Sequence, residues 1–301
     1  MASSVSHNAK EDKAWSLFKK TLFNSRPARL QSRAGIGEFQ RRVYAVDKLC
    51  QRELPWRKRR TPYRVLVSEL MLQQTQAGRV VPKYRAFLKD LGSFKALAKA
   101  DTSEVIKLWQ GLGYNRRALA LKRTAEIVHS SYSGRLPRDY EALLALPGIG
   151  DYTAKAVRIY AYNFDDVLIE TNIRSLFTYC FFPECSAVSD ADLLPLIASA
   201  VDRKDPARWY DALMDLGVLV KANVPRIVQR NKAHRAQSQF QGSHRQKRGM
   251  LLKALSSKGS LTCREAAACV ELDAALVKSI LEELKSEQFL ELSKGRYSLR
   301  K

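Results

Sequence analysis

Two glutamates in this sequence stand beside apolar residues, where a carboxyl group could act as an acid or a base. Glu69 lies in the run Ser68–Gln76 (SELMLQQTQ), among leucines and a methionine. Burial among such neighbours raises the pKa of a carboxyl group, so that it keeps its proton near neutral pH and can act as a general acid. Helical spacing predicts that Glu69, Gln73 and Gln76 share one face. The alternative is a surface glutamate on an amphipathic helix, which the spacing alone favours.

The second glutamate, Glu170, closes the apolar run Val167–Ile169 and precedes Thr171–Arg174 (TNIR), where a helix is expected to begin. An acid in this place commonly caps the helix and interacts with its dipole. The same N–H groups would also keep the carboxylate ionised. One protonated and one ionised carboxyl group are what hydrolysis of a glycosidic bond through a cationic sugar requires. Capping and catalysis therefore both remain open for Glu170.

A glycine-containing turn, Leu146–Thr153 (LPGIGDYT), lies between two segments with helical spacing. Gly148 and Gly150 can adopt positive φ and carry no Cβ, so successive N–H groups can converge on one oxygen beside the positive end of the next helix. This arrangement predicts a helix-to-helix hairpin that binds phosphate. A tight turn without a ligand is the alternative, and the basic charge of the chain favours phosphate.

The chain has 301 residues, with 52 Lys and Arg against 30 Asp and Glu and a formal net charge of +22. Such an excess indicates a polyanionic partner, of which nucleic acid is the simplest. A hydrophobic content of 46%, with no apolar run of about 18 residues, predicts a soluble globular protein with no membrane partner. The five cysteines include no CxxC pair and there is no histidine at zinc spacing. We therefore expect no metal site and a reducing, cytoplasmic location.

Apolar residues recur at helical spacing from Ile36 to Leu216, interrupted by short turns, and no segment there shows a convincing strand pattern. This predicts a mostly α fold. We expect four parts along the chain: a basic N-terminal arm (1–33), a helical domain (34–221), a basic linker (222–245) and a C-terminal domain (246–301). A short helix from Asp12 to Leu22 is an alternative for part of the arm.

From Gln246 the pattern predicts a helix, a short strand, two helices and a hairpin, which is the order of a winged helix. The hairpin tip, Lys294-Gly295-Arg296, is basic. Many winged helices bind duplex DNA through the third helix and the hairpin, whereas others dock onto proteins. The charge of this domain favours DNA.

Seven motifs occur in an order that identifies a family. They are Leu54–Arg57 (LPWR), Thr61–Tyr63 (TPY), Ser68–Gln76, Leu108–Tyr114 (LWQGLGY), Leu146–Ala154 (LPGIGDYTA), Ile169–Arg174 (IETNIR) and Met214–Gly217 (MDLG). In this order they resemble the adenine DNA glycosylases of the MutY type, within the helix-hairpin-helix superfamily that includes endonuclease III. The resemblance covers residues 36–240 and implies a helix-hairpin-helix DNA glycosylase fold, followed here by the winged-helix domain.

The resemblance implies roles for individual residues. Glu69 would protonate the base, and Glu170 would stand where the family has its catalytic aspartate, with Tyr152 and Asn172 supporting it. Gln73 and Gln74 would enter the base stack as the target nucleotide turns out. Further DNA contacts are expected at Trp56, Arg57, Leu146, Gly148, Gly150, Thr153, Lys155, Lys294 and Arg296.

Three departures from the family pattern bear on function. Glu170 is longer than the family's aspartate by one methylene, roughly 1.5 Å. The cysteines that hold an iron–sulfur cluster in most relatives are replaced by Lys221, Val228, Asn231 and Gln237, so we expect no cluster and no other cofactor. The winged helix stands where many relatives have a domain that recognises 8-oxoguanine, so we expect no such domain here, and the opposite-base preference stays open.

Tyr152 stands where strand-cutting relatives have a lysine that forms a Schiff base, so the resemblance implies base removal without strand cleavage. The expected activity is hydrolysis of the N-glycosidic bond of an adenine mispaired with guanine or 8-oxoguanine in duplex DNA. The enzyme would be a monomer associated with the nucleoid in the cytoplasm. Two alternatives remain: a glycosylase for mismatched thymine or uracil, and a DNA-binding protein without catalysis.

Overall fold

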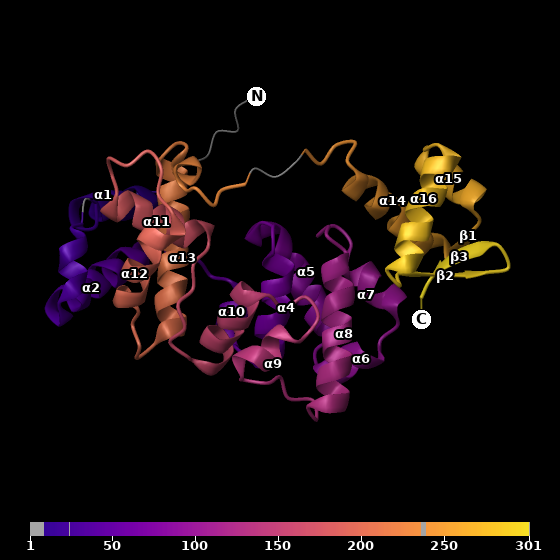
Figure 1. The fold of residues 1–301 in the computed structure, drawn as a ribbon, viewed down its shortest axis with the longest axis horizontal. Helices are drawn as coiled ribbons and strands as arrows, with labels where there is room; N and C mark the ends of the chain where they lie inside the picture. Colours follow the sequence, from indigo (N-terminus) through magenta and orange to yellow (C-terminus); the bar gives the residue numbers. More distant parts are fainter. Residues whose placement is uncertain (1–8, 24, 236–238, 301) are drawn as a thin grey trace. The chain divides into compact units, whose positions relative to one another are not determined.

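The computed structural model describes residues 9–23, 25–235 and 239–300, and in these residues the fold is mostly helical, as predicted (Figure 1). The chain divides into two compact units. Unit 1 comprises residues 1–54 and 155–236, and unit 2 comprises residues 55–154 and 237–301. The helical domain expected as one piece is thus shared between two units. Within the described residues, none of the helices combines the length and hydropathy that crossing a bilayer requires.

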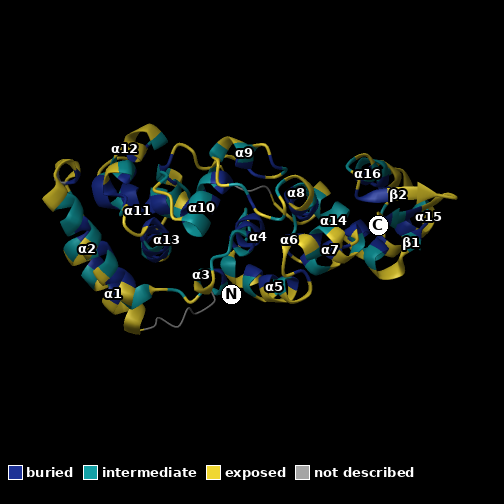
Figure 2. Cartoon of the chain, turned by 90° about the horizontal axis from the view of Figure 1, so that it is seen from below, coloured by how far each residue is buried: buried dark blue, intermediate teal, exposed yellow. Residues whose placement is uncertain are grey.

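Unit 1 is built around α11 (Thr171–Phe181) and α13 (Pro206–Asn223), which pack against each other along largely buried sides (Figure 2). Phe39 of α2 (Arg33–Cys50) contacts Phe177 and Trp209, with ring centroids 6.0 and 6.2 Å away. The other elements of the unit are α1 (Ala9–Thr21), η1 (Pro27–Gln31), α12 (Asp190–Ala200), η2 (Ile227–Arg230) and most of α10 (Asp151–Tyr162). Each long helix turns one apolar stripe inward, as its spacing predicts.

Helix α1 corrects the interpretation of residues 1–33 as a basic arm. Ala14, Phe18 and Leu22 have no exposed surface, and the rings of Trp15 and Phe18 lie 5.7 and 5.9 Å from that of Tyr179. This part of the segment therefore belongs to the core of unit 1. Of the two interpretations of this segment, the helix at 12–22 agrees with the structure, although α1 begins earlier, at Ala9.

The basic linker expected at 222–245 also differs from the structure. Helix α13 continues to Asn223, and Ile227 is buried. The segment that follows is tied down, because Val188 N–H donates to the carbonyl of Arg230 and Lys232 N–H donates to the carbonyl of Val188, at 2.8 and 3.0 Å. Residues 222–232 are thus part of unit 1 instead of a connector.

Unit 2 contains the helices that surround the SELMLQQTQ motif. They are α3 (Pro55–Lys58), α4 (Pro62–Leu72), α5 (Ala77–Asp90), α6 (Phe94–Lys99), α7 (Thr102–Trp109), α8 (Arg116–Ser131) and α9 (Tyr140–Leu144). Helix α4 begins with the favoured pair of a threonine cap, Thr61, and a proline in the first turn. Every residue from Val65 to Met71 is buried, so α4 is the central helix of this unit.

The C-terminal module, residues 244–300, has the predicted order of elements. These are α14 (His244–Lys258), β1 (Ser260–Leu261), α15 (Cys263–Val270), α16 (Ala274–Ser286), β2 (Leu290–Ser293) and β3 (Arg296–Leu299). The strands form an antiparallel sheet in the order β1-β3-β2. The β2–β3 turn places Lys294 and Gly295 at φ +47° and +73°, a conformation that suits glycine.

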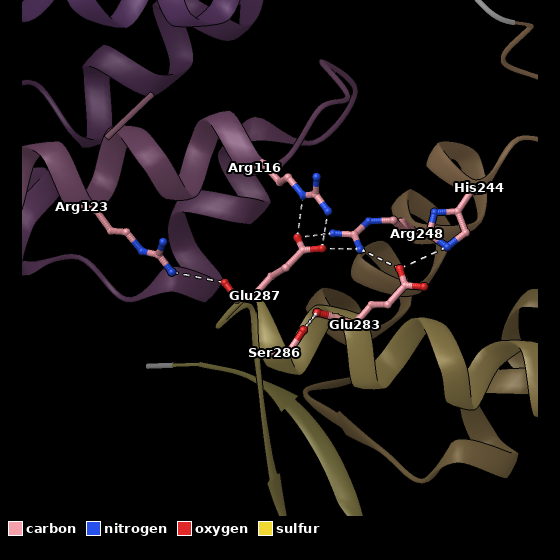
Figure 3. A network of polar contacts seen from close by, with 7 residues as sticks. All are labelled: Arg116, Arg123, His244, Arg248, Glu283, Ser286 and Glu287. Atoms are coloured by element: carbon pink, nitrogen blue, oxygen red, sulfur yellow. Dashed lines mark hydrogen bonds and ion pairs between the residues drawn. The ribbon is translucent and has the colours of Figure 1, made fainter. Parts of the chain in front are cut away.

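The C-terminal module contacts α8 through an ion-pair network centred on Glu287, at the end of α16 (Figure 3). Its carboxylate accepts from Arg116 at 2.6 and 2.8 Å and from Arg248 at 2.6 and 2.9 Å. Arg123 also donates to the carbonyl of Glu287, at 3.3 Å. The hydrogen bond from Arg116, with support from Arg248, lowers the pKa of Glu287 to about 2.

We expect Glu287→Gln to remove a pH-dependent part of the stability. A carboxyl group whose pKa is lowered by folding stabilises the folded state above its ordinary value of 4.5. That contribution is lost as the pH falls towards 2. The difference in unfolding free energy between the natural protein and Glu287→Gln should therefore be largest above pH 4.5 and shrink below it, measured by denaturant unfolding across pH. The control is Glu271→Gln, at an exposed residue of the same module; an equal pH dependence in both variants would refute this account.

Candidate active site

Glu69 is buried in α4, with 7% of its surface exposed. Its neighbours in the helix, Ser68 and Leu70, are buried as well. The interpretation of Glu69 as a surface glutamate is therefore wrong. Glu69 thus lies in the buried part of α4, Val65–Met71, instead of on the solvent-exposed surface.

The helical face predicted for Glu69, Gln73 and Gln76 does not exist. Helix α4 ends at Leu72, Gln73 follows as its C-cap, and Gln76 is the N-cap of α5. The helix breaks at Gln73, whose ψ of 115° is not helical, and Gln74 follows in a left-handed conformation at φ +53°. Gln74 is exposed on the resulting turn, whereas Gln73 turns inward, and its Nε2 donates to Oγ1 of the buried Thr153 at 3.2 Å.

Arg117 of α8 holds this turn, and the sequence analysis did not single it out. Its Nη1 donates to the carbonyl oxygens of Leu70, Met71 and Gln73 at 2.7, 3.0 and 2.5 Å. Its Nη2 donates to Thr75 Oγ1 at 3.2 Å and to the carbonyl of Gly113 at 3.0 Å. The side chain is buried, which lowers its pKa to about 10. The only sequence signal was indirect: the last carbonyls of a buried helix need donors.

The predicted hairpin is present between α9 and α10, and Gly148 is the glycine that it requires. Gly148 adopts φ +77°, and a Cβ there would lie 2.7 Å from Cβ of Ala120. Thr124 Oγ1 fixes the turn by donating to the carbonyl of Pro147 at 2.8 Å. Gly150, in contrast, does not adopt positive φ, and a Cβ at this residue would meet none of the described atoms within 4 Å. The space beside Gly150 lets another molecule approach the backbone closely.

The other residues expected at the DNA surface fall into two groups. Trp56 and Leu146 are buried, and Trp56 lies edge-on to Tyr84 with ring centroids 5.6 Å apart, so both serve mainly as packing residues. Partly or fully exposed positions are occupied by Arg57, Tyr152, Lys155, Lys294 and Arg296. Arg296 donates to the carbonyl of Ser260 at 3.0 Å and pairs with Glu265 at 2.9 Å, so its charge is partly used within the module.

In unit 1, Glu170 caps the N-terminus of α11. Its Oε1 accepts from the N–H groups of Asn172 and Ile173 at 2.6 and 3.0 Å, and its Oε2 accepts from Asn172 Nδ2 at 3.2 Å. The structure therefore brings Asn172 against Glu170, as the resemblance implies. Burial raises the pKa of Glu170, while the N–H groups of Ile173 and Asn172 act in the opposite direction. The pKa of Glu170 is therefore raised overall, because the capping hydrogen bonds offset only part of the effect of burial.

Helix α13 brings a cation towards this cap. Gly217 of α13 packs directly on α11, since a Cβ there would lie 2.3 Å from the carbonyl oxygen of Asn172. Lys221 follows one helical turn later on the same face. It is half-buried, and its positive charge lowers the pKa of Glu170 while burial lowers the pKa of the amine itself. Lys221 is a second residue whose position the sequence analysis did not interpret as part of the site.

Comparison with known proteins decides the family. A model of the HhH-GPD superfamily of base excision DNA repair proteins matches residues 67–248, more than half of the chain. The chain belongs to this superfamily. An adenine DNA glycosylase of Mycolicibacterium smegmatis is 32% identical over 272 residues, which cover 81% of this chain and 93% of the relative. The predicted resemblance to the adenine DNA glycosylases is therefore confirmed.

Other HhH-GPD relatives are matched over less of their length. The chain spans only 49% and 59% of two further adenine DNA glycosylases. A thymine/uracil-DNA glycosylase of Methanothermobacter thermautotrophicus is 37% identical over 123 residues, 40% of this chain and 56% of the relative. Among solved structures, a trapped endonuclease III–DNA covalent intermediate matches with a TM-score of 0.50 and 16% identity, over 61% of this chain and 84% of that one. This likeness supports the fold.

The residues at the cluster positions of the HhH-GPD resemblance do not fit an iron–sulfur cluster. Lys221 carries an amine near Glu170, Val228 has no ligating atom, and Asn231 uses Oδ1 to accept from Ala233 N–H at 2.8 Å. Gln237 lies outside the described residues. Arg230 holds this segment by donating to the carbonyl oxygens of Pro183 and Cys185, at 3.0 and 2.6 Å. Within the described part of the chain, no group of three or more His, Cys, Asp or Glu could bind a metal ion.

We expect Lys221→Met to raise the pKa of Glu170 further, because an ionised carboxylate loses a neighbouring cation. Lys221→Arg, which keeps the charge, should leave the pKa of Glu170 close to its value in the natural protein. The measurement is a pH titration of the Glu170 carboxyl carbon by NMR. Equal titration curves for the Met and Arg variants would show that Lys221 does not act on Glu170.

Proposed function

We propose that this protein is a DNA N-glycosylase that hydrolyses the bond between deoxyribose and an adenine mispaired with guanine or 8-oxoguanine. The observation that carries the proposal is the burial of Glu69 in α4, in a chain 32% identical to an adenine DNA glycosylase over nearly the whole of that relative. A proton donor for a purine leaving group needs such a place.

Two carboxyl groups have separate roles in the proposed hydrolysis. Glu69 protonates the adenine ring and makes it a better leaving group. Glu170, in its ionised form, stabilises the cation that develops on the sugar, and water completes the hydrolysis to leave an abasic site. Asn172 orients Glu170 through its contact with Oε2, and the positive charge of Lys221 favours the ionised form of Glu170.

Duplex DNA is the partner that these features suit. The net charge of +22 favours a polyanion. The hairpin around Gly148 and Gly150 grips the backbone together with Lys155 and Arg57, while the Gln73–Gln74 turn enters the base stack as the adenine turns out. The protein acts as a monomer in the cytoplasm, close to the nucleoid, and its chemistry uses no iron–sulfur cluster and no metal.

The excision assay tests this proposal. We expect release of adenine from A·8-oxoguanine and A·G duplexes and no release of pyrimidine from T·G and U·G duplexes. Glu69→Gln should slow excision by about 10²- to 10⁴-fold, the usual contribution of a general acid. Glu104→Gln, at an exposed residue of the same unit, is the matched control. Excision of adenine by Glu69→Gln at the natural rate would rule out the assigned acid.

The likeness to a thymine/uracil-DNA glycosylase supports a second candidate function. Release of thymine or uracil from the T·G and U·G duplexes, with adenine left intact, would replace the adenine proposal. Excision by Glu170→Asp alone, with none by the natural chain, would indicate a DNA-binding protein in which position 170 has lost its catalytic function.

We expect no covalent adduct between the natural protein and DNA, because the phenol of Tyr152 cannot form a Schiff base with the sugar. Borohydride treatment during turnover, followed by denaturing electrophoresis, measures this. Tyr152→Lys provides the positive control, since an amine at this position could attack the sugar. A high yield of trapped complex with the natural protein would overturn the assignment as a glycosylase without strand cleavage.

A further inference from the structure

Winged helices that bind DNA commonly do so through their third helix, which is α16 in the C-terminal module. Here the end of α16 contacts α8 instead. Figure 3 shows Glu287 between Arg116 of α8 and Arg248 of α14, with Glu283 one turn earlier on α16. Oε2 of Glu283 in turn lies 3.2 Å from Nε2 of His244 and 3.3 Å from Nη1 of Arg248. The end of α16 is therefore acidic and already paired within the chain. Acidic side chains there repel phosphates, which makes this helix a poor reader of duplex DNA.

A second contact leads from the C-terminal module to the turn after α4. Arg245 of α14 donates to the hydroxyl of Tyr114, and its guanidinium carbon lies 4.9 Å from the centre of the Tyr114 ring. The guanidinium carbon of Arg117 lies 5.3 Å from the same ring centre. Arg117 Nε also donates to the carbonyl of Tyr114, at 3.3 Å. Tyr114 thus connects a cation of the module with the arginine that holds residues 70–75.

The backbone at this connection is held in unusual conformations on both sides. Tyr114 adopts φ +48° and Gln74 adopts φ +53°. Non-glycine residues persist at positive φ only where their surroundings compensate for the strain. Arg117 contacts both turns, through the carbonyls of Gln73 and Gly113, at 2.5 and 3.0 Å. Arg117 therefore links Tyr114 to the Gln73–Gln74 turn through direct contacts.

We propose that the C-terminal module is a brace: Glu287 docks it on α8, and Arg245 acts through Tyr114 and Arg117 to position the Gln73–Gln74 turn. The inference rests on the proposed function, because it gives that turn a place in the base stack. It makes Arg245 a positioning residue for base excision and assigns the module a role within this chain instead of on DNA.

Arg245→Met tests the brace, with Lys253→Met as its matched control. Lys253 is an exposed residue of the same helix, and its replacement removes the same charge. We expect Arg245→Met to slow single-turnover excision of adenine from an A·8-oxoguanine duplex about tenfold, less than the roughly 10²-fold cost of a 1 Å displacement. Affinity for an undamaged duplex should change no more than it does in Lys253→Met.

A double variant and hydrogen exchange link this loss to the turn. The double variant Arg245→Met, Gln73→Ala should excise adenine as fast as Gln73→Ala alone, because both substitutions act on the Gln73–Gln74 turn. Exchange of the Gln73 and Thr75 amides, which donate to Glu69 and Leu72 carbonyls at 3.2 and 3.0 Å, should be faster in Arg245→Met and unchanged in Lys253→Met. Tyr114→Phe, which keeps the ring, should show a smaller change in the same direction if Arg245→Met proves too unstable to assay.

The outcomes separate the inference from the proposed function. If Arg245→Met matches Lys253→Met in excision rate and amide exchange, the brace is refuted while the glycosylase proposal stands. A loss of affinity for undamaged duplex with an unchanged rate at saturating protein would also refute it, because the module would then bind DNA itself. If the natural protein excises no base from any duplex, the proposed function fails, and the exchange measurement still decides whether the module braces the turn.

Discussion

Unit 2 depends on the buried guanidinium group of Arg117. The end of a helix leaves carbonyl oxygens without partners, and in α4 these oxygens lie in the interior, where water cannot satisfy them. Arg117 supplies the donors for Leu70 and Met71 and continues to Gln73 and Thr75. A buried carbonyl left without a donor costs about 1–3 kcal/mol. Arg117 therefore stabilises the end of α4, just after Glu69, and the turn beyond it.

In unit 1, the backbone groups that need partners lie at the N-terminus of a helix, α11. The first N–H groups of α11 need acceptors, and Glu170 provides them. Gly217 lets α13 approach the backbone at Asn172, which a side chain would prevent. That close approach brings Lys221 near enough to influence the cap electrostatically. In both units, a group proposed to act on DNA is positioned by the requirement to satisfy the backbone at a helix end.

The sequence was sufficient for features that depend on local patterns. Helical spacing located most helices, the glycines located the hairpin, and the order of elements after Gln246 was correct. It failed where a tertiary contact decides the outcome. Helix α4 ends at Leu72 and turns at Gln73, whose carbonyl oxygen accepts from Arg117, and nothing in the SELMLQQTQ run encodes Arg117. Phe18 and Leu22 look like isolated apolar residues in a basic segment until α2 and α11 supply the surface they cover.

The proposed reaction gives Glu170 the role of the family's aspartate, and the cap accounts for how its longer side chain is held. An extra methylene would carry an extended side chain roughly 1.5 Å further out. Glu170 is not extended away from its helix, because Oε1 accepts from two N–H groups of the first turn of α11. The added length is used in folding back to the cap, and a carboxylate still has lone pairs left on Oε2 beyond the contact with Asn172 Nδ2. The cap therefore holds Oε1 in place, and Oε2 is the oxygen that the proposed reaction would use to stabilise the developing positive charge.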